Sequence, residues 1–126
     1  AGTAMKPMIL RAPLIMMFGD GLTVCPWLVL IRWEMSATQR KHLIPHELTH
    51  VAQMRRDGWW TFMRRYLTDQ KERLAYEVAA YKVSVANGMG IYEASRALSK
   101  YYIYTDDGTP LTMEHAKQLL ESDTQL

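Results

Sequence analysis

The segment that most restricts how this chain can fold is His46-Glu47-Leu48-Thr49-His50. Residues four apart lie on the same side of an α-helix, so on a helix the two imidazoles can reach a single tetrahedral metal ion. Pro45 suits the first turn of such a helix, and Gly58, after the basic pair Arg55-Arg56, suits its end. The sequence therefore predicts a histidine-bearing helix from about Pro45 to Gly58, with helical structure setting in from Ser36 onward.

This helix has an expected core face that is separate from its histidines. The residues of that face are Ile44, Leu48, Val51 and Ala52, which fall within an arc of about 100° on a helical wheel. His46 and His50 lie on the opposite side. We therefore expect a second part of the chain to cover the histidine side.

Before this helix, two apolar runs flank Gly19-Asp20-Gly21, a glycine-containing connector typical of a β-hairpin. In the second run, Trp27 to Met35, the side chains alternate between an apolar face and one that becomes polar toward its end, which predicts a β-strand. Because Pro13 and Pro26 lack an N–H group, we expect these strands at or near a sheet edge.

The rest of the chain is predicted to be helical. Helices are expected at about 59–67, 69–87, 92–101 and 112–121. An Asp69/Glu72 capping-box pattern opens the second of these, and Thr112 caps the last. We therefore expect one α+β domain over residues 1–126, mainly helical, with a small N-terminal β-hairpin or sheet packed on the histidine-bearing helix.

Composition places the chain among ordinary globular proteins, with 48% hydrophobic and 22% charged residues. The net charge of +2 is too small to indicate a polyanionic partner, so no nucleic acid is expected. Cys25 is the only cysteine, which excludes an intrachain disulfide and a Cys-rich zinc site. No apolar run suits a signal peptide or a membrane span, so we expect a soluble protein, with the cytoplasm favoured. Ala1-Gly2-Thr3-Ala4, before Met5, is interpreted as vector-derived.

A catalytic zinc ion takes three protein ligands and leaves one position for water, so the histidine pair needs a third ligand. The acidic candidates are Asp57, Asp69, Glu72, Glu77 and Glu93. The apolar stripe of the 69–87 helix consists of Leu74, Val78, Tyr81 and Val85, and Glu77 falls at its edge. A carboxylate on a buried face is costly unless it is paired or bound to metal. We therefore predict that His46, His50 and Glu77 bind one zinc ion per chain; the alternative for Glu77 is a salt bridge to Arg73, Lys82 or another basic residue.

Two imidazoles in this motif, followed about one helix later by Glu77, resemble the zincin metallopeptidases. Within that group the pattern is most similar to the gluzincin branch, whose third ligand is a glutamate on the next helix, and to its minimal members. The resemblance covers residues 27–85. A metzincin pattern is excluded, because the next histidine after His50 is His115. Many gluzincins carry an aspartate one turn after the ligand glutamate, where this chain has Tyr81.

The resemblance implies a zinc-dependent hydrolase that cleaves a peptide bond through metal-activated water, with Glu47 as the general base. Tyr81 is the first choice for a hydrogen bond to the oxyanion, ahead of Tyr76 and Tyr66; it could instead accept an imidazole N–H or belong to the core. Zincins hold their substrate along an edge strand before the active helix. That role would fall to the strand at 27–35, by β-augmentation.

Two other functions stay open at this point. One is a non-catalytic binding or assembly module, such as a component of a phage or bacterial particle, that retains the zinc-bound scaffold. The other is a zinc hydrolase of a non-peptide amide. The intact Glu47 favours an enzyme, because a purely structural zinc ion needs no general base. A further hypothesis is that the C-terminal carboxylates of Glu114, Glu121 and Asp123 approach the zinc in a latent form.

Overall fold

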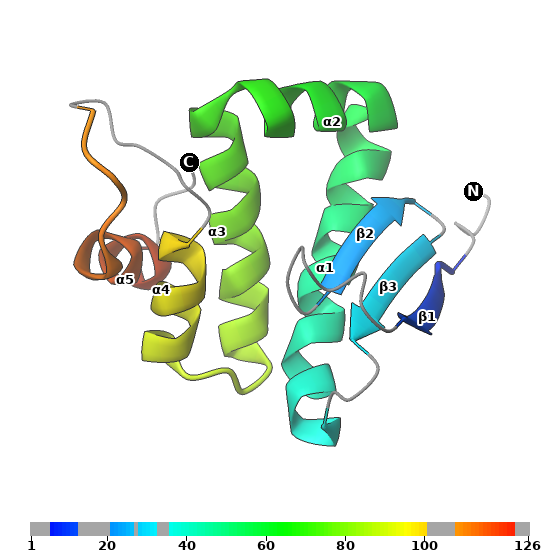
Figure 1. Ribbon diagram of the computed structural model, residues 1–126, viewed down its shortest axis with the longest axis horizontal. Helices are drawn as coiled ribbons and strands as arrows, with labels where there is room; N and C mark the ends of the chain where they lie inside the picture. The colour runs from blue at the N-terminus through cyan, green and yellow to red at the C-terminus, as the bar shows by residue number, and fades with distance from the viewer. Residues whose placement is uncertain (1–5, 13–20, 27, 33–35, 101–107, 123–126) are drawn as a thin grey trace.

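The computed structural model describes residues 6–12, 21–26, 28–32, 36–100 and 108–122. These residues form, in chain order, β1 (Met8–Ala12), β2 (Gly21–Cys25), β3 (Leu28–Arg32), α1 (Ala37–Asp57), α2 (Trp59–Thr68), α3 (Gln70–Ala86), α4 (Ile91–Ser99) and α5 (Met113–Glu121). The expected α+β class, mainly helical with a small N-terminal sheet, is confirmed (Figure 1).

The sheet has the strand order β1-β3-β2, with β1 parallel and β2 antiparallel to β3. Among the described strands, β2 and β3 are the antiparallel pair that follows directly in sequence. The hairpin expected across Gly19-Asp20-Gly21 involves residues 13–20, which lie outside the described residues. Pro26 lies between β2 and β3, where its missing N–H removes no bond from the interior of either strand. The second-run strand, β3, was expected at or near a sheet edge; it lies between the two described edge strands, next to an edge on either side but not at one. Since β1 and β2 occupy both of its edges, β3 cannot take up a substrate strand by β-augmentation.

The sheet packs on α1, as expected. Val29 of β3 is fully buried against Val51 and Leu43 of α1. Figure 1 shows β2 as the strand that lies beside α1. This contact places the sheet next to the helix that carries both histidines.

Helix α1 begins earlier than Pro45. Ser36 is its N-cap, and its hydroxyl accepts a hydrogen bond from the Gln39 N–H, while the Gln39 side chain accepts one from the Ser36 N–H. This capping box starts the helix two turns before Pro45, which lies in the helix interior. The N–H that Pro45 lacks would have bonded the carbonyl of Lys41, an exposed residue, so water can satisfy that carbonyl. Thr49 Oγ1 donates to the Pro45 carbonyl at 2.8 Å.

The buried face of α1 is not the one that its apolar residues predict. Leu48 is 37% exposed and Ala52 is also exposed, so of the expected core face Val51 alone is fully buried. The buried residues of α1 are His42, His46, Glu47, His50, Val51, Gln53 and Met54. The core face predicted from the helical wheel was wrong because polar groups with partners on a neighbouring helix can occupy a buried face, and α3 supplies such partners.

Helices α1 and α3 lie side by side, and α2 connects them at one end (Figure 1). The helix boundaries after Gly58 agree with expectation. The Asp69 side chain caps α3 by accepting from the N–H groups of Lys71 and Glu72, and Thr112 caps α5. The apolar stripe of α3, which includes Val78 and Tyr81, packs against a core formed with α4 and α5. No helix within the described part of the chain is long and apolar enough to cross a membrane.

Candidate metal centre

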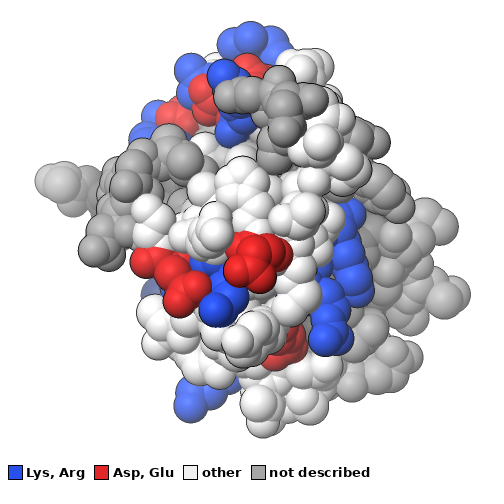
Figure 2. All heavy atoms as spheres, turned by 90° about the vertical axis from the view of Figure 1, so that its left-hand side faces the viewer, with Lys and Arg blue, Asp and Glu red and all other residues white. Residues whose placement is uncertain are grey.

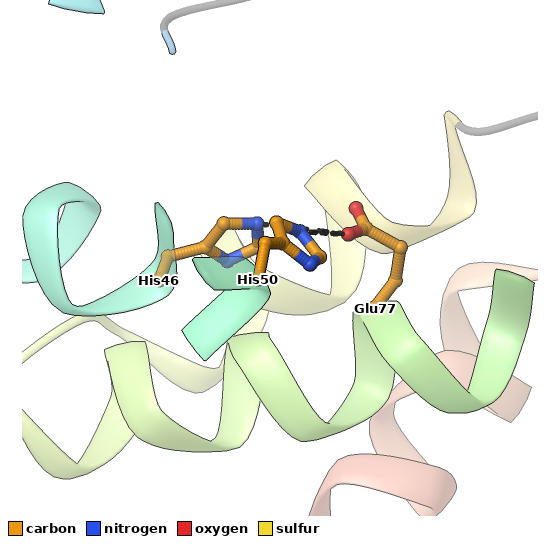
Figure 3. Close-up of side chains that lie close together, drawn as sticks. All are labelled: His46, His50 and Glu77. Atoms are coloured by element: carbon orange, nitrogen blue, oxygen red, sulfur yellow. Dashed lines mark ion pairs between the residues drawn. The ribbon is translucent and has the colours of Figure 1, made fainter. Parts of the chain in front are cut away.

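Three side chains converge between α1 and α3, as Figure 3 shows: His46 and His50 from successive turns of α1, and Glu77 from α3. Glu77 Oε1 lies 2.5 Å from His50 Nε2 and 3.8 Å from His46 Nε2. One donor atom from each residue lies within 4.8 Å of the other two. All three are buried, with 2%, 7% and 0% of their surface exposed for His46, His50 and Glu77. The predicted ligand set is therefore brought together in space.

These donors fit a zinc ion in type and in spacing. Two imidazole nitrogens and one carboxylate oxygen form a common ligand set for catalytic zinc. With metal–ligand bonds of about 2.0–2.2 Å, the ligand atoms of a tetrahedral site lie about 3.3 Å apart. The distances from Glu77 Oε1 to His50 Nε2 and His46 Nε2, 2.5 and 3.8 Å, lie on either side of this value. Small side-chain rotations would therefore bring the three donors around one ion.

The electrostatics of the two imidazoles differ. Burial alone lowers the pKa of His50, but the charge and hydrogen bond of Glu77, with help from Glu47 and Gln53, outweigh it and raise this pKa to about 9. Burial lowers the pKa of His46 to about 4, although Glu77 acts in the opposite direction. At neutral pH without metal, the Glu77 carboxylate is therefore balanced by an imidazolium at His50, and His46 is neutral. This pairing explains how a fully buried glutamate is tolerated.

The other acidic candidates for the third ligand lie elsewhere. Asp57 accepts hydrogen bonds from Arg56 and from the Tyr76 hydroxyl, and Asp69 caps α3. Glu93 is exposed on α4, and Glu72 lies in the first turn of α3. These placements leave Glu77 as the carboxylate that meets the histidine pair.

The basic residues considered as alternative partners of Glu77 are bonded to backbone carbonyls. Arg73 donates to the carbonyls of Tyr66 and Leu67, and Lys82 donates to that of Ser122. Within the described residues, the imidazoles of His46 and His50 are the groups that lie within ion-pair distance of Glu77.

Glu47 is also buried, with 5% of its surface exposed. Its charge helps to raise the pKa of His50 and that of Tyr66. The Glu47 carboxylate is therefore coupled electrostatically to His50 of the pair. Glu47 is thus a second buried carboxylate that influences this cluster, in addition to Glu77.

The three candidate tyrosines have different surroundings. The Tyr81 ring packs against the His46 ring with 4.3 Å between their centroids. The Tyr76 hydroxyl donates to Asp57 Oδ2 at 2.7 Å, so its proton is engaged by that carboxylate. Tyr66, on α2, has its ring 6.2 Å from that of His50. Burial, followed by the charge of Glu77, raises the pKa of Tyr66 well above its usual value, so its hydroxyl keeps its proton at neutral pH.

Sequence reasoning did not identify Gln53. This buried residue of α1 contacts the His50 imidazole, with 2.8 Å between Gln53 Oε1 and His50 Nδ1. The available signal was its position three residues after His50, which places both on one face of the helix.

The C-terminal helix does not bring its carboxylates to the centre. Glu114 and Glu121 are exposed on α5, which packs on α4 and α3, and Glu121 pairs with Lys117. Figure 2, which views the molecule from the α5 side, shows carboxylates on this surface. The latent arrangement is wrong for Glu114 and Glu121, and Asp123 lies outside the described residues.

No protein-family model, curated protein or solved structure matches this chain. The assignment of the site therefore depends on its own residues and their geometry.

Proposed function

We propose that the chain is a zinc-dependent hydrolase that cleaves a peptide bond, with His46, His50 and Glu77 as the metal ligands and Glu47 as the general base. One observation carries this proposal: three buried donors of the catalytic zinc type converge, and a second buried carboxylate, from the residue after the first histidine, influences one of them electrostatically. A structural zinc site usually has four protein ligands and needs no such carboxylate, whereas a catalytic site keeps one coordination position open.

Zinc is favoured among the divalent metals because imidazole and carboxylate together suit it, and no cysteine is needed. Three protein ligands leave a coordination position open. A zinc ion bound there would act as a Lewis acid, activating water and polarising the carbonyl of the scissile bond.

The residues of the chain would divide the remaining work. Glu47 would accept a proton from the attacking water and deliver it to the leaving amine, which is the task of a general acid–base group held within hydrogen-bonding reach. A protonated tyrosine hydroxyl is suited to donate a hydrogen bond to the developing oxyanion. Tyr81 and Tyr66 both lie against the imidazoles and are the candidates for this donor.

The test compares Glu47→Gln with Glu93→Gln, a matched control that makes the same change at an exposed site on α4. Zinc content is measured by mass spectrometry after dialysis, and cleavage of a broad peptide library by liquid chromatography with mass detection. We expect about one zinc ion in the wild type and both variants, with hydrolysis lowered about 100-fold or more by Glu47→Gln alone.

Two outcomes would contradict the proposal. Equal hydrolysis by the wild type and Glu47→Gln would show that Glu47 is not the general base. The wild type could instead bind zinc but cleave no peptide, with Glu47→Gln behaving like the wild type. This result would favour the binding or assembly module.

A further inference from the structure

We infer that Gln53 is a positioning residue, which holds the His50 imidazole in the orientation and protonation pattern that present Nε2 to the metal. This inference rests on the proposed metal site and assigns a role to a side chain that is itself no ligand.

The contacts of Gln53 join two parts of the centre. Its Oε1 accepts a hydrogen bond from His50 Nδ1 at 2.8 Å, and its Nε2 donates to the carbonyl of Tyr76 at 3.0 Å. Both side chains of the Gln53–His50 pair are buried. Tyr76 immediately precedes Glu77 on α3. A single amide therefore links one ligand ring on α1 to the backbone next to another ligand on α3.

The direction of these bonds follows from the chemistry of the groups. The Tyr76 carbonyl can only accept a hydrogen bond, so the amide nitrogen of Gln53 must face it. That orientation turns Oε1, which can only accept, toward His50. His50 Nδ1 must then carry a hydrogen, and the lone pair available to a metal ion lies on Nε2. Nε2 is the atom that faces Glu77.

The two histidines differ in this support. Among the described residues, no hydrogen-bond partner meets His46 Nδ1, which is buried. The His46 ring is instead packed edge-on against Tyr81 and against His50. The hydrogen bond that His50 donates to Gln53 thus makes His50 the better oriented ligand of the pair, and its loss should lower the metal affinity directly. Removing such a bond to a ligating histidine typically weakens metal binding about 10- to 100-fold.

Two substitutions separate positioning from simple tethering of α1 to α3. Gln53→Met keeps the length of the side chain and removes both bonds. Gln53→Glu keeps an acceptor for His50 Nδ1 but loses the donor to the Tyr76 carbonyl. Gln118→Met, at an exposed position of α5, is the matched control. Far-ultraviolet circular dichroism establishes that each variant is folded.

The first measurement is the zinc dissociation constant, from competition with a chromophoric chelator. We expect Gln53→Met to raise it about 10- to 100-fold, and Gln53→Glu and Gln118→Met to change it by less than about threefold. Equal weakening by Gln53→Met and Gln53→Glu would show that the tether to Tyr76 matters and the acceptor does not. No weakening by Gln53→Met would equally overturn the inference.

The second measurement needs no metal. In protein labelled with nitrogen-15 in histidine, the hydrogen-bonded Nδ1–H of His50 should give a cross-peak that is protected from exchange with water, assigned by its loss in His50→Ala. We expect this peak in the wild type and Gln53→Glu, with and without zinc, and its loss in Gln53→Met. Its persistence in Gln53→Met would refute the role of Gln53. If the wild type bound no zinc, the proposed function would fail, while this comparison would still decide what orients His50.

Discussion

The contact between Glu77 and His50 makes a quantitative prediction for the metal-free protein. We consider Glu77→Gln, which keeps the shape of the side chain and removes its charge. In the wild type this charge is the main influence that raises the pKa of His50 above its ordinary value of 6.5, to about 9. In the variant, burial of the imidazole acts without that opposing charge, so the His50 pKa should fall well below 9.

The size of the effect follows from the difference between the two values. One pKa unit corresponds to about 1.4 kcal/mol, so a rise from 6.5 to about 9 corresponds to about 3 kcal/mol of the free energy of unfolding. Because the folded state binds this proton more tightly than the unfolded state, the stabilisation is complete below pH 6.5 and is lost as the pH rises through about 9. Glu77→Gln should therefore cost about 3 kcal/mol near pH 6 and less than about 1 kcal/mol near pH 10.

The assay is urea unfolding of both proteins in the presence of a chelator, followed by circular dichroism at several pH values. In a thermal unfolding scan near pH 6, the same loss should lower the melting temperature by about 10 °C. Glu121→Gln is the control: its carboxylate is exposed and faces Lys117 one turn away, so its removal should cost only about 0.3 kcal/mol. A loss for Glu77→Gln that does not change between pH 6 and pH 10 would refute the assignment of an ion pair to His50 and Glu77.

Three further predictions test other parts of the structure. Zinc must displace the proton of His50, so the apparent dissociation constant for zinc should rise about tenfold for each unit that the pH falls from about 8 to about 6. Calorimetry in buffers of different ionisation enthalpy should show about one proton released per zinc ion bound. Tyr76→Phe removes the hydrogen bond to Asp57 and should cost about 1 kcal/mol in urea unfolding, with zinc affinity unchanged. Pro45→Ala gives the interior of α1 an N–H that can reach the Lys41 carbonyl and should raise the free energy of unfolding by about 1–3 kcal/mol; a lower stability would contradict this account of the helix.

The features that could be predicted from the sequence have local causes. Asp69 and Thr112 cap helices through bonds to residues two or three positions away, and Gly58 ends α1 with a positive φ of 87°. Glu77 could be singled out because a lone carboxylate beside an apolar stripe has to be compensated. The same local logic placed the onset of helical structure at Ser36 but wrongly assigned Pro45 to the first turn of the histidine-bearing helix, because proline is common there and the Ser36/Gln39 capping box was not recognised.

The features that could not be predicted depend on contacts between distant segments. The parallel pairing of β1 with β3 has no local signal, since it is formed by residues about 20 apart. The buried face of α1 was misassigned because Leu48 is apolar and His46 is polar, whereas burial there is decided by Glu77 on another helix. Gln53 was overlooked for the same reason. Its importance lies in its hydrogen bonds to His50 and Tyr76, which an uncharged amide in the sequence does not predict.

The most direct test of the metal centre is anomalous X-ray scattering from crystals of the zinc-loaded protein, with data collected on both sides of the zinc absorption edge. We expect one peak per chain, bonded to His46 Nε2, His50 Nε2 and a Glu77 carboxylate oxygen at about 2.0–2.2 Å. A protein that shows no zinc peak between these three side chains, or one that binds zinc only elsewhere, would contradict the account.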